Sequence, residues 1–406
     1  MANELFARNA WVEKVKKFHD TGLIKVITGI RRCGKSSLMR LCVNDLLENG
    51  VSPESIVYIN FELMEYDQVR DYAALYKTVK GKMAQDEKYY IFLDEPQQVE
   101  GWEKAVNSLR AETNADICLT GSNAWLLSSE IATLLSGRYV EIHLLPLSFK
   151  EFIDFGKFSQ NTPKTEIFNR YLSFGGFPDI HALPEDAETV YNFLNGIYNT
   201  VIVKDILSRH AVKDIKIFER LIKFLAQNTG NLVSPSNIAN YINSSQHGQA
   251  VKSTTISSYL DFLEKAYIVY PSYRYDIKGK ELLKTLCKYY IVDTGLRRVV
   301  FEASGDIGST IETVVYFELL RRGYKVFAGK QYDKEIDFLA VKNDERRYYQ
   351  VALSILDETV KKRELAPLAS VKDNYEKTIL TMDTLKFPDE DGIKIRNVVD
   401  WLLEGD

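Results

Sequence analysis

Residues 24–37, IKVITGIRRCGKSS, constrain the fold of this chain more than any other stretch. The first five residues are mostly apolar and β-branched, which predicts a buried strand, and the residues after the stretch have the apolar periodicity of a helix. Between them stand Gly29, four further residues, and then Gly34-Lys35-Ser36, the G-x-x-x-x-G-K-S pattern of a phosphate-binding P-loop. The sequence therefore predicts a strand, a glycine-rich turn and a helix N-terminus that together hold an anion.

The residue types in this loop suit Mg·ATP. The glycines allow the backbone to turn so that successive N–H groups point at one phosphate. We expect Lys35 to reach the β- and γ-phosphates and the Ser36 hydroxyl to be a ligand of Mg²⁺. The alternative is a glycine-containing turn that matches by chance. The predicted nucleotide-binding residues are Gly29, Ile30, Arg31, Arg32, Cys33, Gly34, Lys35, Ser36 and Ser37.

A second apolar run, residues 89–93, ends in the two carboxylates of Asp94 and Glu95. This is the Walker B pattern, and its distance from the P-loop suits a strand brought alongside the first. We expect Asp94 to hold Mg²⁺ directly or through water, and Glu95 to orient and polarise the attacking water. The alternative is a strand that merely ends in an acidic turn.

A third apolar run, residues 116–119, ends in Thr120-Gly121-Ser122-Asn123. Ligands of open α/β sheets bind at the carboxyl ends of the strands, so Ser122 or Asn123 could sense phosphate or position water. We include Asn123 among the candidate catalytic residues. The alternative for either residue is a turn and a helix N-cap.

Arg138 stands after Gly137 and just before a predicted strand at residues 139–144. An arginine in this place could complete the active site of a neighbouring subunit as an arginine finger. We therefore count Arg138 as a candidate catalytic residue and expect a homo-oligomer as its context. The alternative is an ordinary solvated arginine.

Composition places the chain among globular proteins. It has 406 residues, 45% of them hydrophobic, and a net charge of −4, so we expect about two to three domains without a general excess of basic residues. The four cysteines lack metal-ligand spacing, which favours a reducing compartment. No apolar run reaches the length of a membrane span and the first residues carry no secretory signal, so we expect a cytoplasmic protein without membrane contact.

Several motifs, taken in order, resemble the AAA+ family of ATPases. They are Gly29–Ser36, Leu93-Asp94-Glu95, Thr120-Gly121-Ser122 and Leu135-Ser136-Gly137-Arg138. The chain is similar to an archaeal and bacterial branch with a nuclease-like C-terminal domain, and residues 145–152 and 175–178 resemble that branch's lid region. The resemblance implies an α/β P-loop NTPase core with a parallel sheet over residues 1–147 and a helical lid over residues 148–213.

The middle of the chain predicts a different module. Helical stretches at residues 217–228, 235–243 and 253–266, followed by a strand at 267–270, suggest a winged helix within residues 214–300. Such a module often contacts DNA, but it also serves as a protein–protein module, and both interpretations stay open. Residues 277–300 form the most basic stretch of the second half: either a DNA-contacting segment or a solvated connector. Its basic residues are Lys278, Lys280, Lys284, Lys288, Arg297 and Arg298.

Residues 301–406 resemble the PD-(D/E)xK nuclease superfamily in the order of their predicted elements. The resemblance implies that Glu312 and Asp337 stand where metal ligands are expected. Where a Glu-x-Lys is expected, this chain has Gln350-Val351-Ala352. We therefore expect a nuclease-like fold without nuclease activity.

Three functions follow as hypotheses. The first is a Mg²⁺-dependent ATPase whose cycle moves its winged-helix and nuclease-like modules, with DNA as a candidate partner. The second is a slow nucleotide-gated switch that binds protein or DNA with little turnover. The third is an active nuclease that ATP regulates. Glu95 favours the first, and Gln350 and Ala352 count against the third.

Overall fold

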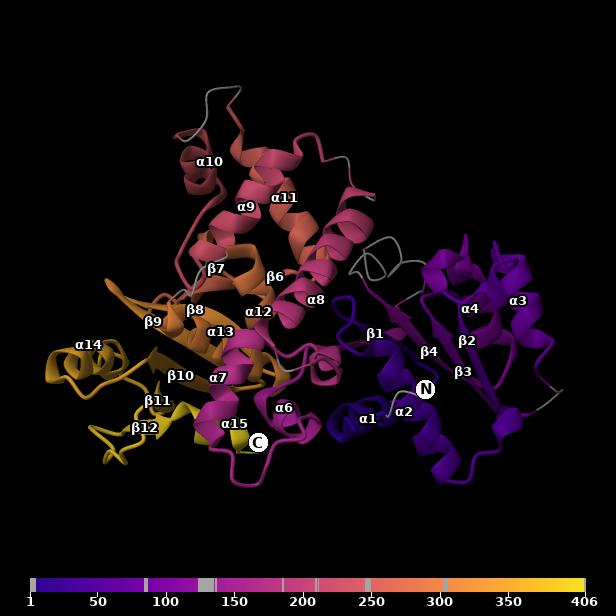
Figure 1. The fold of residues 1–406 in the computed structure, drawn as a ribbon, viewed down its shortest axis with the longest axis horizontal. Coiled ribbons are helices and arrows are strands. Elements are labelled where there is room, and N and C mark those ends of the chain that lie inside the picture. Colours follow the sequence, from indigo (N-terminus) through magenta and orange to yellow (C-terminus); the bar gives the residue numbers. More distant parts are fainter. Residues whose placement is uncertain are drawn as a thin grey trace. The chain divides into compact units, whose positions relative to one another are not determined.

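The computed structural model describes most of the chain: residues 5–83, 87–122, 135, 137–184, 186–208, 210, 212–244, 250–301 and 306–404. These residues form two compact units (Figure 1). Unit 1 contains Met1–Leu145 together with Lys265–Tyr267, and unit 2 contains Pro146–Glu264 and Ile268–Asp406. The P-loop lies in unit 1.

Unit 1 is built on a five-stranded, fully parallel sheet with the strand order β2-β3-β4-β1-β5. The P-loop strand β1 therefore lies between β4 and β5, and β3, which carries the two carboxylates, is two places away from it. The strands are β1 (Ile24–Thr28), β2 (Ile56–Asn60), β3 (Tyr89–Asp94), β4 (Ala115–Gly121) and β5 (Tyr139–His143). The helices are α1 (Asn9–Lys16), α2 (Lys35–Glu48), α3 (Tyr72–Lys80) and α4 (Trp102–Glu112), with short turns η1 (Pro53–Ser55), η2 (Met64–Tyr66) and η3 (Pro96–Gln98).

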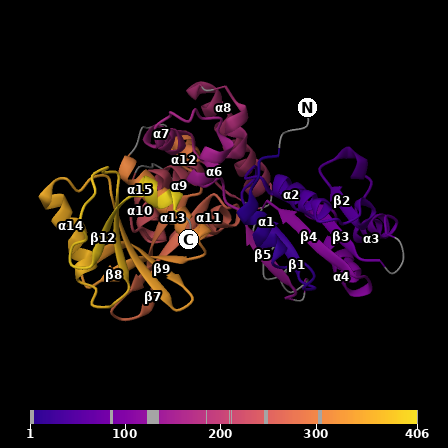
Figure 2. The same cartoon turned by 90° about the horizontal axis from the view of Figure 1, so that it is seen from below.

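Helices cover both faces of this sheet, which explains why its strands read as continuous apolar runs. All five residues of β1 are buried. One core joins apolar side chains of the strands to those of α3 and α4, for example Leu75 and Trp102. Figures 1 and 2 show α2 and α4 on opposite faces of the sheet. The first residue of α2 is Lys35, so the P-loop connects the end of a central strand directly to a helix N-terminus.

Unit 2 begins with helices. They are α6 (Phe149–Phe155), α7 (Lys164–Phe174), η5 (Pro178–Ala182), α8 (Ala187–Thr200), the π-helical η6 (Val201–Leu207), α9 (Ile215–Gln227), α10 (Pro235–Ser244) and α11 (Ser253–Lys265). Ser148 and Glu151 form a capping box at the start of α6, which satisfies the first backbone donors of the helix. The described part of residues 148–213 is mostly helical, as its sequence predicts.

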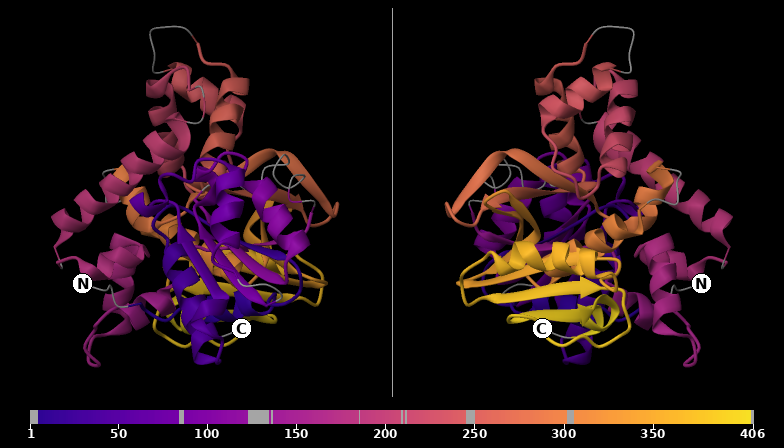
Figure 3. Two further views of the ribbon diagram at one scale, coloured as in Figure 1. Left: turned by 90° about the vertical axis from the view of Figure 1, so that its right-hand side faces the viewer. Right: turned by 90° about the vertical axis from the view of Figure 1, so that its left-hand side faces the viewer.

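A seven-stranded mixed sheet follows, with the order β12-β11-β10-β9-β8-β6-β7 (Figure 3, its last strands in yellow). The strands are β6 (Val269–Asp276), β7 (Glu281–Ile291), β8 (Lys325–Gln331), β9 (Lys334–Lys342), β10 (Glu345–Ala352), β11 (Glu376–Thr381) and β12 (Ile393–Asn397). The helices are α12 (Thr294–Phe301), α13 (Ile307–Arg321), α14 (Glu358–Ala369) and α15 (Val398–Leu403). The β6–β7 hairpin follows three helices in the predicted order, but β6 also pairs with β8 and so joins this sheet.

The structure corrects part of the prediction for residues 277–300. The segment is not a connector, because it contains all of β7 and most of α12, and it is not basic surface along its whole length. Lys288 and Arg297 are buried within unit 2, where they donate to internal acceptors. Their charges are therefore not available to DNA phosphates. A residue-by-residue count of basic side chains cannot distinguish buried cations from solvated ones.

Two other differences concern element boundaries. The spacing of Leu5, Trp11, Val12, Val15 and Phe18 predicts an amphipathic helix over residues 3–20, whereas the structure has the shorter helix α1, Asn9–Lys16. The sequence also predicts a short helix over residues 128–136, which lie almost entirely outside the described residues. Among the described residues, no helix has both the length and the apolar character needed to cross a membrane.

Candidate active site

Two glycines give the P-loop its path. Gly29 has φ +143°, and a Cβ there would lie 2.1 Å from the carbonyl oxygen of Leu144, so a larger residue could not lie this close to the chain after β5. Gly34 has φ +99° and caps α2, a conformation that glycine adopts without strain. Arg32 also has a positive φ, +66°. The loop thus turns sharply between strand and helix where the sequence predicts it.

Lys35 is the buried cation of this loop. Its ammonium donates to the backbone carbonyls of Gly29 at 3.0 Å and Ile30 at 3.2 Å, and only 6% of the residue is exposed. Both acceptors are neutral, so neither removes the lysine's positive charge. The lysine therefore stays a fixed charge inside the turn of the loop.

Asp94, the last residue of β3, is fully buried. One carboxylate oxygen accepts from the Thr120 hydroxyl at 2.5 Å and the other from the Tyr58 hydroxyl at 3.1 Å. Thr120 lies on β4 opposite Ile27 of β1. The sheet therefore brings Asp94 to the same edge as the P-loop, with β4 between them.

Glu95 follows in a left-handed conformation, φ +56° and ψ +48°, which is uncommon for a residue with a side chain. Its backbone N–H donates to the Thr120 hydroxyl at 3.0 Å. Burial raises the pKa of Glu95, and the charges of Lys35 and Arg31 oppose that shift. The positive charge of Lys35 therefore acts on the Glu95 carboxylate, so two of the predicted catalytic groups influence each other.

The remaining predicted loop residues differ in exposure. Ile30 and Cys33 are buried, and burial raises the pKa of the Cys33 thiol, so this cysteine packs rather than reacts. Arg31 forms an ion pair at 3.4 Å with Glu62, which follows β2. Ser36 is half-buried and Ser37 is exposed in the first turn of α2.

Sequence reasoning missed a cluster under the P-loop. The hydroxyl of Thr28, directly before Gly29, lies 2.5 Å from a carboxylate oxygen of Glu141 and 2.9 Å from His143 Nδ1. Burial lowers the pKa of His143 to about 4, and Lys35 acts in the same direction, so the imidazole is neutral at neutral pH. His143 reaches the P-loop through the pairing of β5 with β1, and no local sequence pattern predicts that position.

Arg8 also supports the loop. It is buried, and its guanidinium donates to the Cys33 carbonyl at 3.1 Å and to the Leu145 carbonyl at 3.2 Å. These two bonds join the P-loop to the residue that ends unit 1. The only sequence signal is an arginine before an amphipathic helix, which is too common to be used.

The two remaining predicted catalytic residues do not add to the described part of this edge. Asn123 lies outside the described residues. Arg138 is exposed, and its carbonyl accepts from the N–H of Ile24 at 3.0 Å, which is the first residue of β1. The P-loop follows Thr28 at the other end of that strand, roughly 13 Å away at the usual rise per residue. Within one chain, Arg138 therefore stands at the opposite edge of the sheet.

The residues predicted for a nuclease-like site lie in unit 2. Asp337 is on β9 and accepts from the N–H of Val351 on β10 at 2.9 Å, while its own N–H lies 3.3 Å from the Gln350 side-chain oxygen. Glu312, on α13, lies 3.0 Å from the ammonium of Lys288 on β7. The sheet thus gathers these residues, with a lysine that the sequence prediction did not include.

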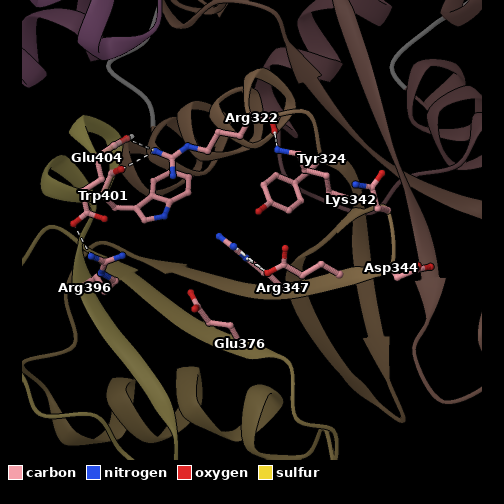
Figure 4. A pocket seen from close by; sticks show the side chains of 11 residues that line it. Arg322, Tyr324, Lys342, Asp344, Arg347, Glu376, Arg396, Trp401 and Glu404 are labelled. Atoms are coloured by element: carbon pink, nitrogen blue, oxygen red, sulfur yellow. Dashed lines mark hydrogen bonds and ion pairs between the residues drawn. The ribbon is translucent and has the colours of Figure 1, made fainter. Parts of the chain in front are cut away.

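Unit 2 also holds a cavity of about 420 Å³ lined by charged and aromatic side chains, Trp401 among them (Figure 4). Arg347 donates to Glu345 at 3.0 Å, and Arg396 donates to Glu404 at 2.5 Å. These arginines and glutamates pair with each other in the lining of the cavity, so the lining does not favour either an anionic or a cationic ligand.

Comparisons with known proteins agree with the geometry of unit 1. Residues 21–153 match the family described as "AAA domain", and residues 165–306 match a domain of unknown function, DUF8612. An uncharacterized protein of Haemophilus influenzae is 44% identical over all of both chains. Uncharacterized protein MJ1544 of Methanocaldococcus jannaschii is 30% identical over 88% of this chain and 78% of its own.

This chain belongs to the family of these two relatives, and residues 21–153 are its AAA domain. The fold of this AAA-domain protein is also similar to the Walker-type ATPase PABY2304 of Pyrococcus abyssi, with a TM-score of 0.52. That likeness covers 74% of this chain and 97% of the other at 16% identity, so it shows the fold alone. The family therefore has an AAA-type P-loop core.

Proposed function

We propose that this AAA-domain protein binds Mg·ATP at the P-loop and hydrolyses it. The observation that carries the proposal is that the parallel sheet brings the buried Lys35, Asp94 and Glu95 to one edge. In P-loop NTPases a lysine of this kind cradles the β- and γ-phosphates. A carboxylate beside it is the usual partner of the metal.

The donor set suits Mg²⁺, which prefers oxygen ligands. The Ser36 hydroxyl, in the first turn of α2, and the Asp94 carboxylate would hold the ion, which supplies positive charge to the phosphates when it is bound. Thr120 and Tyr58 hold the Asp94 carboxylate in one orientation. Glu95 would accept a proton from water aligned with the terminal phosphate, and its raised pKa favours that role.

The test is release of inorganic phosphate from ATP at steady state, with Mg²⁺ and with excess EDTA. We expect turnover that requires both Mg²⁺ and intact Lys35. Binding of ATP without measurable turnover would reject hydrolysis and leave nucleotide binding standing. Absence of ATP binding would reject the proposal as a whole.

One observation favours the second hypothesis, a slow nucleotide-gated switch. The Gln97 side-chain amide donates to the Glu95 carboxylate, and the Ser122 hydroxyl lies 3.5 Å from the same oxygen. These two contacts occupy one carboxylate oxygen of the proposed base, which would slow each cycle if that oxygen must reach water. We expect Gln97→Ala to raise turnover if these contacts limit the rate. Unchanged turnover in Gln97→Ala would mean that the contacts of Glu95 do not limit the rate.

We further propose DNA as the partner of the three helices α9, α10 and α11. Lys216, Arg220 and Lys223 are exposed along α9 at spacings of four and three residues, which places them on one face. Lys252 and Thr254 are exposed at the start of α11. Fluorescence anisotropy with a labelled duplex tests this: affinity should fall steeply with salt and fall further in the variant with all three α9 cations changed to Ala. Absence of duplex binding at low salt would reject DNA as the partner of these helices.

A further inference from the structure

Lys288 is the most enclosed cation of the sheet in unit 2. It lies on β7, and only 1% of the residue is exposed. Its ammonium lies 2.8 Å from a carboxylate oxygen of Glu335, 3.0 Å from one of Glu312 and 3.4 Å from one of Asp337. Three carboxylates from two elements, α13 and β9, therefore converge on one nitrogen atom.

The carboxylates themselves are held in place. Glu312 accepts a hydrogen bond of 2.7 Å from the Tyr290 hydroxyl, and a Cβ at Gly230 would lie 2.9 Å from its other oxygen. Asp337 accepts from the backbone N–H of Val351 at 2.9 Å. The cluster is thus fixed by backbone and side-chain contacts on several sides, unlike a mobile pair on a surface.

The side chain of Glu335 is 40% exposed, but those of Lys288, Glu312 and Asp337 are largely buried, and burial of charges is costly unless each finds a partner. Burial alone would lower the pKa of Lys288, but Glu312, Asp337 and Glu335 together raise it above its usual value. The lysine is therefore charged at all physiological pH values. Removing it would leave three carboxylates close together with no cation between them.

We propose that the Lys288 ammonium is the built-in cation of this cluster, in the position where three carboxylates would otherwise gather a divalent metal ion. Carboxylate oxygens that bind Ca²⁺ or Mg²⁺ lie about 2.0–2.6 Å from the ion, whereas these lie 2.8–3.4 Å from the nitrogen. An ammonium and a metal ion cannot share that space. With Lys288 between them, the three carboxylates do not form a metal site as they stand: among the described residues, no group of three or more His, Cys, Asp or Glu side chains could hold a metal ion.

Two consequences follow for unit 2. Its sheet is stabilised without metal, and it lacks the bound cation that metal-assisted phosphodiester cleavage requires. This inference does not depend on the proposed ATPase activity, because every residue in it lies in unit 2 and the tests below omit nucleotide.

The first test uses Lys288→Ala, which removes both the charge and the volume of the ammonium group. We expect a lower unfolding temperature than wild type and a rise of about 5 °C or more when Mn²⁺ is added at about 100 times its dissociation constant. The matched control is Lys25→Ala. Lys25 is equally buried in unit 1, but its ion pair is with one carboxylate, Asp116, so Mn²⁺ should not restore that variant.

A second variant identifies the ligands. Lys288→Ala combined with Glu312→Gln should lose the response to Mn²⁺. A folded Lys288→Ala protein that binds no Mn²⁺, or whose response survives Glu312→Gln, would contradict the proposal.

The wild-type protein supplies a test that does not depend on the variant folding. Electron paramagnetic resonance should give the same Mn²⁺ binding for the wild type and for Asp337→Asn, because no Mn²⁺ is expected to bind at Asp337 in the wild type. Incubation of wild type with plasmid and single-stranded DNA in Mg²⁺ or Mn²⁺ should leave both intact. The proposal would be overturned if the wild type bound stoichiometric Mn²⁺ and Asp337→Asn did not. It would also be overturned if the wild type cleaved DNA and Asp337→Ala did not. Either result would show an open metal site beside Lys288.

Discussion

Lys35 in unit 1 and Lys288 in unit 2 are both buried lysines beside a sheet, but their partners differ. The ammonium of Lys35 donates to two neutral backbone carbonyls, whereas that of Lys288 contacts three carboxylates. The charge of Lys35 is not neutralised by the groups it contacts, so it can still attract an anion from outside. The charge of Lys288 is balanced within unit 2. Burial alone therefore does not indicate a binding site; the net charge of the neighbouring groups does.

The largest expected effect concerns a cation brought to the P-loop edge from outside. Arg138 lies at the opposite edge of its own sheet, so as an arginine finger it would act on a neighbouring subunit. Arg138→Ala should then lower turnover by about 1,000-fold, the usual minimum for such a residue, in a protein that assembles. Phosphate release is measured beside sedimentation velocity.

The control for Arg138 is a mixing experiment. Arg138→Ala subunits keep an intact P-loop and Lys35→Ala subunits keep the arginine, so mixed assemblies should regain part of the activity. If mixing restores nothing, Arg138 has no role in trans.

The second prediction concerns the anion that faces Lys35. Glu95→Gln should keep ATP binding and reduce turnover by about 100-fold or more, because an amide cannot take up the proton of the attacking water. Quenched-flow phosphate release and equilibrium binding of ATP measure the two properties separately. Glu100→Gln, a change in the loop before α4, is the control. Turnover at the wild-type rate in Glu95→Gln would remove Glu95 from catalysis.

The third and smallest prediction concerns the neutral imidazole near Lys35. NMR titration, with the signal assigned by its loss in His143→Gln, should give His143 a pKa near the value of about 4 that burial imposes. The unfolded state takes up this proton near pH 6.5 and the folded state only near pH 4. As the pH is lowered from 6.5 to 4, the free energy of unfolding should therefore decrease by up to about 3 kcal/mol. Above pH 6.5 this group should cause no pH dependence.

His143→Gln should remove that part of the pH dependence and leave the rest. A His143 signal that titrates near pH 6.5 would mean that the P-loop edge tolerates a second cation beside Lys35. The contrast between Lys35, which donates only to neutral carbonyls, and Lys288, which contacts three carboxylates, would then not explain the charge of the P-loop edge.

The parts of the site that the sequence predicts are local in the chain. Gly29, Gly34 and Lys35 belong to one turn, and Asp94 and Glu95 end one strand, so their spacing alone indicates their place. Thr120 and His143 reach the same edge only through the strand order, which no short pattern encodes. The helical character of residues 148–213 was likewise predictable, from the lack of strand-like alternation, whereas the parallel sheet of unit 1 was expected only from the resemblance to AAA+ ATPases.

The Lys288 cluster was not predictable for the same reason. Its members stand on β7, α13 and β9, far apart in the chain, and the sequence places Lys288 in a run of basic residues that reads as surface. Gln350 and Ala352 led us to expect no nuclease activity. They could not indicate that a lysine lies among Glu312, Glu335 and Asp337.

Isothermal titration of Mg·ATP into two variants tests the central contrast most directly. Lys35→Ala should abolish measurable binding, because it removes the fixed positive charge expected to contact the β- and γ-phosphates. Lys288→Met, in which an apolar side chain of similar length replaces the ammonium, should bind Mg·ATP with wild-type affinity wherever it remains folded. Unchanged affinity in Lys35→Ala would contradict the account of the P-loop, and loss of affinity in folded Lys288→Met would contradict the separation of the two lysines.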